Sequence, residues 1–300
     1  MKLPEWKAKG QYFSHKGHDI FYVEEGQGEP LLLIHGFPTA SWDWWQMWST
    51  LARKYHVLAI DMMGFGFSAK PKGYSYSILD QADIHEAFLK EKGVVKASII
   101  SHDYGDTVAQ ELLARFEDRK KAGEEGFQIE KLCSLNGGLF PETHQALLIQ
   151  KLLMSPIGPL IGNMLNRKKL GKNFRNIFGP NTQPTEEELD EFWELIIHNN
   201  GKAITHLLIR YMAERVAHRE RWVGGMQETS IPLRLINGTF DPISGGHMAD
   251  RYEEIIPNAD VIRLEGIGHF PLIEAPEDVM KYALEFTQSR RDAKKKYTTD

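Results

Sequence analysis

The chain has 300 residues, of which 42% are hydrophobic and 26% charged, a composition typical of a globular protein with a sizeable core. Its formal net charge of −5, with no dominant basic segment, argues against a nucleic-acid partner. A single cysteine, Cys133, excludes an internal disulfide, and no run of about 18 apolar residues predicts a membrane span.

Short apolar runs alternate with helical patterns over most of the chain, which is typical of an α/β fold. The strands that we expect lie at residues 20–23, 31–34, 56–60, 97–100, 129–135, 233–236 and 261–264. Helical periodicity between them is clearest at residues 78–92, 107–115 and 276–288. Strands this apolar suit a mostly parallel sheet whose two faces are covered by helices.

The alternation of strands and helices stops between about residues 137 and 225. This part of the sequence contains amphipathic helical segments at residues 144–153, 185–197 and 203–221, separated by glycine and proline. A block of helices spliced into an α/β chain is interpreted as a cap that lies over the carboxyl edge of the sheet.

The expected organisation therefore has four parts. Residues 1–136 and 229–290 form the α/β core, residues 137–228 form the helical cap, and residues 291–300 form a polar tail.

A sharp turn is predicted at Asp103, between the strand at residues 97–100 and the helix that follows. A nucleophile elbow places its reactive residue on such a strained turn and requires small residues two positions to either side. Ser101 and Gly105 meet this requirement around Asp103. The simpler alternative is that Asp103 only caps the helix, a common role for aspartate at this position.

Two neighbouring residues fit the turn less well as nucleophiles. Ser101 would have Ile99 two positions before it, and Asp106 would have Tyr104. Both neighbours are too large for the tight backbone that the elbow requires. The residue at the tip of the turn is therefore a carboxylate.

Two further chemically capable residues follow later strands. Asp241 lies on a turn after the strand at residues 233–236, and His269 lies on a glycine-bracketed loop after the last strand. The chain order of Asp103, Asp241 and His269 matches the nucleophile–acid–base order that accompanies a nucleophile elbow. Three suitable residue types after three strand ends favour a catalytic triad over a chance arrangement.

The sequence His35-Gly36-Phe37 follows the strand at residues 31–34. This position supplies a backbone N–H to an oxyanion hole, here from Phe37, and the residue after the nucleophile, Tyr104, supplies the second. We expect His35 itself to be a structural hydrogen-bonding residue.

These motifs resemble the epoxide hydrolase and haloalkane dehalogenase branch of the α/β-hydrolases, and more narrowly the mesoderm-specific transcript proteins within it. The likeness extends over residues 35–44, 61–68, 101–113, 135–144 and 221–224. It implies the α/β-hydrolase fold with a cap, and an aspartate nucleophile that attacks an electrophilic sp³ carbon to form an alkyl ester. His269 would then activate a water that hydrolyses the ester, with Asp241 orienting the imidazole.

The leaving group separates the two subclasses, and the cap offers three candidate substrate-binding residues. Epoxide hydrolases use cap tyrosines as proton donors, and Tyr211 resembles one of them, although a packed core tyrosine fits equally well. Dehalogenases commonly place tryptophan after the nucleophile, where this chain has Tyr104, although Trp193 and Trp222 in the cap could substitute. We therefore expect epoxide opening to diols, with haloalkane dehalogenation as the alternative.

The chemistry implied needs no cofactor and no metal, only a small apolar epoxide or haloalkane and water. The glycines of residues 64–68 lack the third glycine of a dinucleotide loop, and His15 and His18 lack the further ligands of a zinc motif. The amino-terminal residues lack the apolar run of a signal peptide, so we expect a cytoplasmic protein. A hydrolase fold that only binds its partner is the non-enzymatic alternative.

Overall fold

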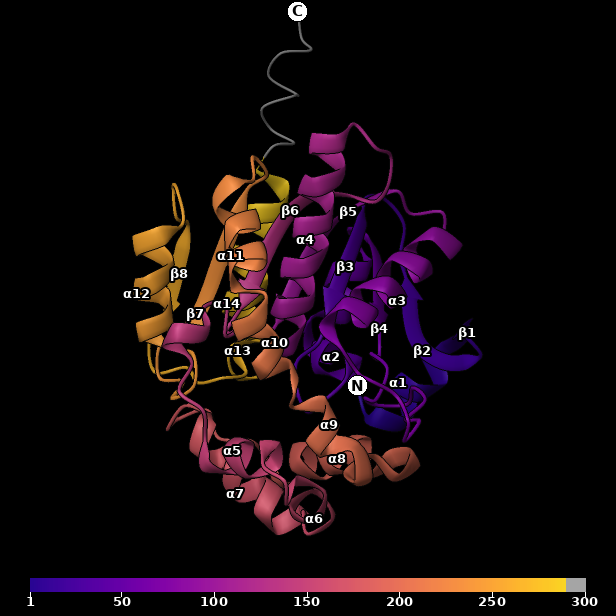
Figure 1. Ribbon diagram of the computed structural model, residues 1–300, viewed down its shortest axis with the longest axis vertical. Helices are drawn as coiled ribbons and strands as arrows, with labels where there is room; N and C mark the ends of the chain where they lie inside the picture. The colour runs from indigo at the N-terminus through magenta and orange to yellow at the C-terminus, as the bar shows by residue number, and fades with distance from the viewer. Residues whose placement is uncertain (290–300) are drawn as a thin grey trace, which may run out of the picture.

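A computed structural model describes residues 1–289 and shows an eight-stranded sheet with helices on both of its faces (Figure 1). The strands are β1 (Gln11–His15), β2 (His18–Glu25), β3 (Pro30–Ile34), β4 (His56–Ile60), β5 (Lys96–His102), β6 (Gln128–Leu135), β7 (Leu233–Gly238) and β8 (Val261–Leu264). They lie in the order β1-β2-β4-β3-β5-β6-β7-β8. The strands β4, β3 and β5 to β8 are mutually parallel, and β2 is antiparallel to both β1 and β4.

The predicted mostly parallel sheet is confirmed, with one additional strand. The edge strand β1 was not expected because Phe13 is its one buried residue, so the run has little apolar signal. In the centre of the sheet, successive side chains of β3 enter different cores. Leu31 and Leu33 pack on one side, and Leu32 and Ile34 on the other.

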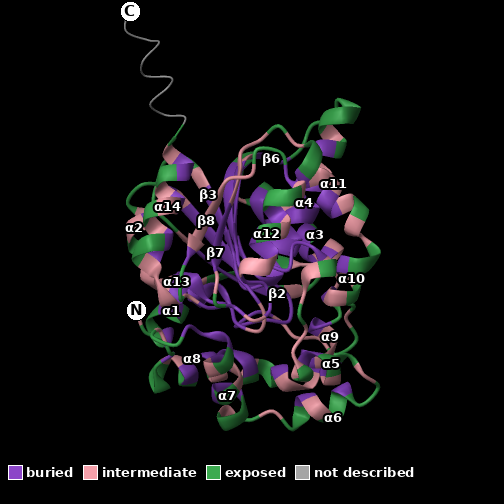
Figure 2. Cartoon of the chain, turned by 90° about the vertical axis from the view of Figure 1, so that its left-hand side faces the viewer, coloured by how far each residue is buried: buried purple, intermediate pink, exposed green. Residues whose placement is uncertain are grey.

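Each of these two cores is completed by its own set of helices (Figure 2). One face of the sheet is covered by α1 (Leu3–Lys9), α2 (Trp45–Ala52), α13 (Pro271–Glu274) and α14 (Pro276–Gln288). The other face is covered by α3 (Ile78–Glu91), α4 (Tyr104–Ala122), α11 (Arg219–Glu228) and α12 (Gly246–Ile255). Helix α4 is longer than the helix that we expected at residues 107–115. It ends where Gly123 adopts a φ of +69°.

Between β6 and β7 the structure has helices and no strand among its described residues. They are η2 (Pro141–Thr143), α5 (Leu148–Met154), α6 (Gly158–Asn163), α7 (Arg167–Ile177), α8 (Glu186–Ile197), η3 (His198–Ile204), α9 (Thr205–Leu208), α10 (Tyr211–Ala217) and α11. In both views α5 to α9 form a separate layer at one end of the sheet, whereas α11 packs along α4 (Figures 1 and 2).

The single helix expected over residues 203–221 is divided into α9, α10 and the start of α11. The break allows the chain to leave the layer of α5 to α9 after Leu208 and to return to the core, where Arg215 is buried against α4. The cap boundaries at residues 137 and 228 remain a prediction. Residue 290 and the predicted tail at residues 291–300 lie outside the described residues.

None of the helices within residues 1–289 is long and apolar enough to cross a lipid bilayer. The ends of β5, β7 and β8 that lead to Asp103, Asp241 and His269 lie at the same edge of the sheet, because these strands are parallel. The fold therefore brings together three residues that are far apart in the sequence.

Candidate active site

Asp103 lies at the tip of the turn between β5 and α4 with φ 46° and ψ −106°. A positive φ is unfavourable for a residue with a side chain and marks local strain. The turn also requires Gly105, since a Cβ at that position would lie 2.6 Å from the carbonyl oxygens of Ile34 and His35. The spacing that predicted the elbow thus corresponds to a tight backbone path across the end of β3.

The Asp103 side chain does not cap α4. Instead its Oδ2 accepts a hydrogen bond of 3.1 Å from the backbone N–H of Phe37. The second predicted oxyanion donor, Tyr104, occupies the first position of α4, where the helix leaves the backbone N–H without an intrahelical partner. One of the two expected donors, the Phe37 N–H, therefore binds the carboxylate, and the role of the Tyr104 N–H stays a prediction.

His35 holds the loop that presents Phe37. Its Nδ1–H donates to the Gly36 carbonyl at 2.8 Å, and its Nε2 accepts from the backbone N–H of Met62 at 3.0 Å. Burial lowers the pKa of His35 to about 3, so the imidazole is neutral, as this pair of bonds requires. The residue has the structural arrangement that we expected.

His269 lies between the two aspartates. Its Nδ1 is 2.8 Å from Asp241 Oδ2, and its Nε2 is 4.0 Å from Asp103 Oδ1. Burial alone lowers the pKa of His269, but the charge and hydrogen bond of Asp241 and the charge of Asp103 raise it to about 9. For Asp241 the effects have the opposite sign. Burial alone raises the pKa of its carboxyl, but the charge and hydrogen bond of His269 bring that pKa below its usual value.

Asp241 is fixed by donors that sequence reasoning did not identify. Asn136 Nδ2 donates to its Oδ2 at 3.1 Å, and Ser244 Oγ donates to the same oxygen at 2.8 Å. The backbone N–H of Ile243 donates to Oδ1 at 2.8 Å. These bonds fix the carboxylate whose Oδ2 lies 2.8 Å from His269 Nδ1. Asn136 follows β6, a strand end that carries none of the three predicted triad residues.

Glu274 on α13 fixes the loop that carries His269. Its carboxylate accepts hydrogen bonds from the backbone N–H groups of Gly268 at 2.9 Å and Phe270 at 3.0 Å. It also accepts a bond of 2.7 Å from the N–H of Gly179, which follows α7. One carboxylate thereby connects the histidine loop to the helical layer above it.

A buried arginine lies behind the Asp103 turn. Arg215 Nη2 is 3.2 Å from the backbone oxygen of Asp103 and 3.7 Å from its Oδ1, and Arg215 Nε donates to Thr107 Oγ1 at 2.7 Å. The guanidinium therefore stabilises the strained turn and places a positive charge next to the carboxylate. Nothing in the sequence around Arg215 distinguishes it from a surface arginine on a helix.

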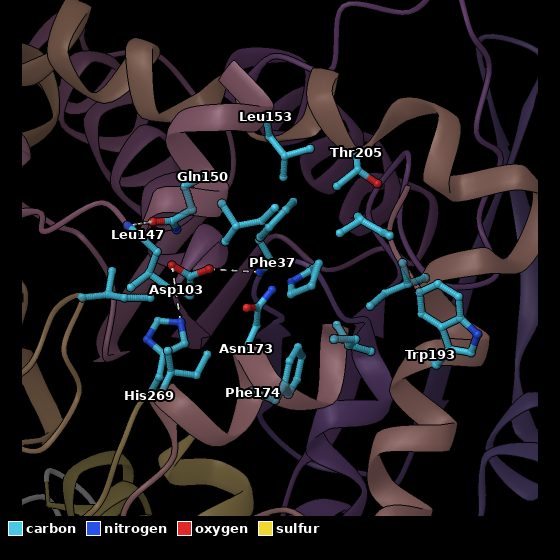
Figure 3. Close-up of a pocket in the computed structure, with 17 residues that line it drawn as sticks. Phe37, Asp103, Leu147, Gln150, Leu153, Asn173, Phe174, Trp193, Thr205 and His269 are labelled. Carbon is cyan, nitrogen blue, oxygen red and sulfur yellow. Dashed lines mark hydrogen bonds and ion pairs between the residues drawn. The ribbon is translucent and has the colours of Figure 1, made fainter. Parts of the chain in front are cut away.

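Asp103 and His269 line a cavity between the edge of the sheet and the layer of α5 to α9 (Figure 3). The space between its walls is about 740 Å³, a volume that includes open solvent. The walls are mainly apolar and include Leu147, Leu153, Leu170, Phe174, Trp193 and Ile243. Gln150, Asn173 and Thr205 are the polar residues that join Asp103 and His269 in lining the cavity, within the described chain.

The three predicted cap residues have different positions. Trp193 lines the cavity, and Figure 3 shows it on the side away from Asp103. Tyr211 is 1% exposed and does not line the cavity, since its ring packs against Tyr104 with centroids 4.6 Å apart and against the Arg215 guanidinium. Trp222 is also away from the cavity, because its Nε1 donates to Glu111 on α4 at 2.8 Å. Tyr211 and Trp222 are therefore packed in the core, and their suggested role in substrate binding stays a prediction.

Gln150 is a polar cavity residue that the sequence did not indicate. It is buried, and its Oε1 accepts a hydrogen bond of 2.8 Å from the backbone N–H of Leu147. This bond orients the Gln150 carboxamide. The Nε2 of Gln150 has no hydrogen-bond partner among residues 1–289. Figure 3 shows Gln150 on the same side of the cavity as Asp103, so its N–H groups are available to a ligand there.

The other titratable groups of the described chain form no group of three or more His, Cys, Asp or Glu side chains suited to hold a metal ion. Cys133 on β6 is fully buried away from the cavity, and burial raises the pKa of its thiol above the usual range.

Comparison with known proteins gives four relevant similarities. Residues 29–123 match the alpha/beta hydrolase fold family. The mesoderm-specific transcript protein of Mus musculus is 39% identical over 298 residues, which cover 96% of this chain and 88% of that protein. A haloalkane dehalogenase DbeA-M1 loop variant from Bradyrhizobium elkanii matches with a TM-score of 0.79 and 19% identity, over 96% of this chain and 98% of that one. The epoxide hydrolase CorEH matches with a TM-score of 0.74 and 20% identity, over 92% and 97%.

Proposed function

This chain belongs to the α/β-hydrolase superfamily, and within it to the group of the mesoderm-specific transcript proteins, and from this premise we propose that it is a hydrolase with Asp103 as its nucleophile. One observation carries the proposal. The Asp103 carboxylate lines an apolar cavity, with the Phe37 N–H 3.1 Å from one oxygen and His269 Nε2 4.0 Å from the other. A structural aspartate would instead have its oxygens occupied by the helix or turn that it caps.

In the first step, a carboxylate oxygen of Asp103 attacks an electrophilic sp³ carbon of the substrate. The C–O bond to the enzyme forms as the bond to the leaving group breaks, and a neutral alkyl ester remains on Asp103. The apolar cavity supports this chemistry, because removal of water strengthens the nucleophile and protects the ester from uncontrolled hydrolysis.

In the second step, a water molecule attacks the carbonyl carbon of the Asp103 ester. His269 takes a proton from that water, and Asp241 stabilises the imidazolium that results. The N–H groups of Phe37 and Tyr104 would stabilise the oxyanion that develops on the former carboxylate. Collapse of this intermediate releases the alcohol and restores Asp103.

The charges around His269 favour this order of events. In the free enzyme the carboxylates of Asp241 and Asp103 oppose the effect of burial and raise the pKa of His269 to about 9, so the imidazole is protonated at neutral pH. Formation of the ester removes the negative charge of Asp103, and the pKa of His269 then falls. The proton can pass to the leaving group or to solvent, and the neutral imidazole becomes available as the base for the second step.

The leaving group needs hydrogen-bond donors in the cavity. Tyr211, the tyrosine suggested as a donor, does not line it, whereas Gln150 carries two N–H groups on the same side as Asp103. An epoxide oxygen gains a full negative charge as the ring opens and is a strong hydrogen-bond acceptor. We therefore assign to Gln150 the stabilisation of this oxygen and favour epoxides over haloalkanes as substrates.

The products of the wild-type protein test this assignment. We expect diol formation from styrene oxide, measured by chromatography, and no halide release from 1,2-dibromoethane, measured with a halide-sensitive dye. Halide release without diol formation would identify the dehalogenase alternative. If no member of a broad panel of epoxides and haloalkanes is converted, the alkyl-enzyme mechanism is wrong and the fold serves binding instead.

Replacement of Gln150 tests its role in the first step. We expect Gln150→Leu to lower kcat for the epoxide identified in the panel by roughly 10- to 100-fold, because a donor to a developing oxyanion is lost. KM should change little, since the charge exists mainly in the transition state. Gln145→Leu, an exposed glutamine on the same segment, is the matched control and should retain wild-type kcat. An unchanged kcat in Gln150→Leu would exclude the proposed donor.

A further inference from the structure

Large apolar side chains are exposed together on the cap. Leu148, Met154, Ile157, Leu160 and Met164, on or beside α5 and α6, are 73%, 40%, 51%, 60% and 52% exposed. We call these five residues the cap tip. Other exposed large apolar residues of the described chain, such as Val95 and Val216, are scattered over separate elements. Isolated exposed apolar residues are common, but a contiguous group of them marks an interaction surface.

The cap tip lies at an extremity of the molecule. Helices α5 and α6 pack against one another, and both views place α6 in the outermost layer, at the end away from the sheet (Figures 1 and 2). A surface in this position can meet a broad, flat partner without a clash from the α/β core.

The sequence segment that carries the cap tip has charges of one sign. From residue 144 to residue 185 the sequence has six Lys or Arg residues and no Asp or Glu, although the whole chain has a net charge of −5. Arg167 and Arg175 are paired with Glu186 on α8. Lys151, Lys168, Lys169 and Lys172 are exposed and make no salt bridge within residues 1–289, and Lys169 Nζ lies 3.3 Å from the backbone oxygen of Met164 in the cap tip.

An apolar groove lies beside this surface and shares part of its wall with the active-site cavity. The groove runs between α5 and α7 and is lined by Leu148 and Leu152 on one side and by Lys169 and Lys172 on the other. Four further residues line both the groove and the active-site cavity, and they are Leu147, Ile149, Leu165 and Asn173. A thin wall of side chains therefore separates the surface beside the cap tip from the space above Asp103.

We propose that the cap tip docks on a phospholipid surface that carries anionic headgroups, with the groove beside it facing the lipid. Apolar side chains of this kind insert at the boundary between headgroups and acyl chains, while lysines beside them interact with anionic lipid. A protein partner would not require a rim of lysines that make no salt bridge within residues 1–289 next to an apolar groove. The inference goes beyond the proposed hydrolase function and does not depend on it.

Flotation of the full chain with lipid vesicles tests the docking surface. We expect at least about tenfold stronger partitioning onto vesicles of phosphatidylcholine mixed with phosphatidylserine than onto phosphatidylcholine alone, and a decrease with added salt. Ile157→Ser/Leu160→Ser should lower binding to the mixed vesicles about tenfold or more. Lys168→Glu/Lys169→Glu/Lys172→Glu should abolish the preference for anionic lipid.

Matched variants outside the cap tip control for surface chemistry. Val95→Ser/Val216→Ser removes two apolar side chains that are 73% and 67% exposed, and Lys54→Glu/Lys90→Glu reverses exposed lysines of the core. Both should bind vesicles like the wild type, and circular dichroism melting should show that all variants are folded. The proposal is overturned if the wild type does not prefer anionic vesicles, or if the cap-tip variant binds as tightly as its control. It is also overturned if the cap-tip variant changes only the oligomeric state in sedimentation, since the surface would then contact a second copy of the chain.

Discussion

Asp103→Asn should lower kcat by at least about 10⁴-fold, a loss comparable to removal of the nucleophile in other covalent enzymes. The amide has nearly the same shape as the carboxylate, and its oxygen can still accept from the Phe37 N–H, which lies 3.1 Å from Oδ2 in the wild type. It lacks the negative charge that attacks carbon. Steady-state kinetics on the epoxide that the wild type converts would measure the loss, and circular dichroism would show that the fold is retained.

Asp106→Asn is the matched control for this substitution. Asp106 is a second buried carboxyl in the same segment, three positions along α4, and it accepts a hydrogen bond from Ser101. Burial raises the pKa of Asp106 to about 8, so it is largely protonated at neutral pH and an amide changes its charge little. We expect kcat within a few-fold of the wild type. An Asp106→Asn loss as large as that of Asp103→Asn would mean that the segment acts through its structure and that Asp103 is not the nucleophile.

The residues of the predicted triad share a feature that can be recognised in the sequence, namely their position after an apolar strand. Asp103, Asp241 and His269 each follow an apolar strand, and parallel strands end at one edge of a sheet. The order of the strands in space was not needed for this prediction. The chain order of the three residues and the small neighbours of Asp103 were sufficient to place them together.

The residues that were missed reach the site through tertiary contacts instead. Arg215 enters it because the chain breaks between α9 and α10 and turns back towards α4, and no local pattern signals that turn. Asn136 follows β6 and Gln150 lies in the first turn of a short helix, so each looked like an ordinary loop or helix residue. One signal was available for Asn136, since it follows a strand end like the residues of the triad.

The aromatic residues of the cap show the limit of pattern reasoning. Helical periodicity indicates that Tyr211 and Trp222 have a buried face, but it does not say what that face is buried against. In the structure Trp222 packs against α4 and Tyr211 against Tyr104 and Arg215, while Trp193 lines the cavity. The direction of each helix determines whether its aromatic side chain faces the core or the cavity. That direction depends on the turns between α8 and α11.

His269→Gln should stop the reaction after the first step and leave the alkyl ester on Asp103. Glutamine can replace part of the hydrogen bonding to Asp241, which is 2.8 Å from Nδ1 in the wild type, but it cannot remove a proton from water. Ester hydrolysis should slow by about 10²- to 10⁴-fold. Intact-protein mass spectrometry after exposure to the epoxide should show an increase equal to the mass of one substrate molecule, and peptide mapping should locate it on Asp103.

The double variant Asp103→Asn/His269→Gln provides the control, because it lacks both the base and the nucleophile and should remain unlabelled. The pH dependence gives a second readout for the role of His269. In the wild type, hydrolysis of the ester requires the neutral imidazole, so its rate should rise with pH until the pKa of His269 in the alkyl-enzyme is passed. That pKa lies below the free-enzyme value of about 9, because the ester has removed the charge of Asp103. A labelled His269→Gln protein whose slow hydrolysis keeps the same pH dependence would assign the base to another residue, whereas a flat profile would assign it to His269.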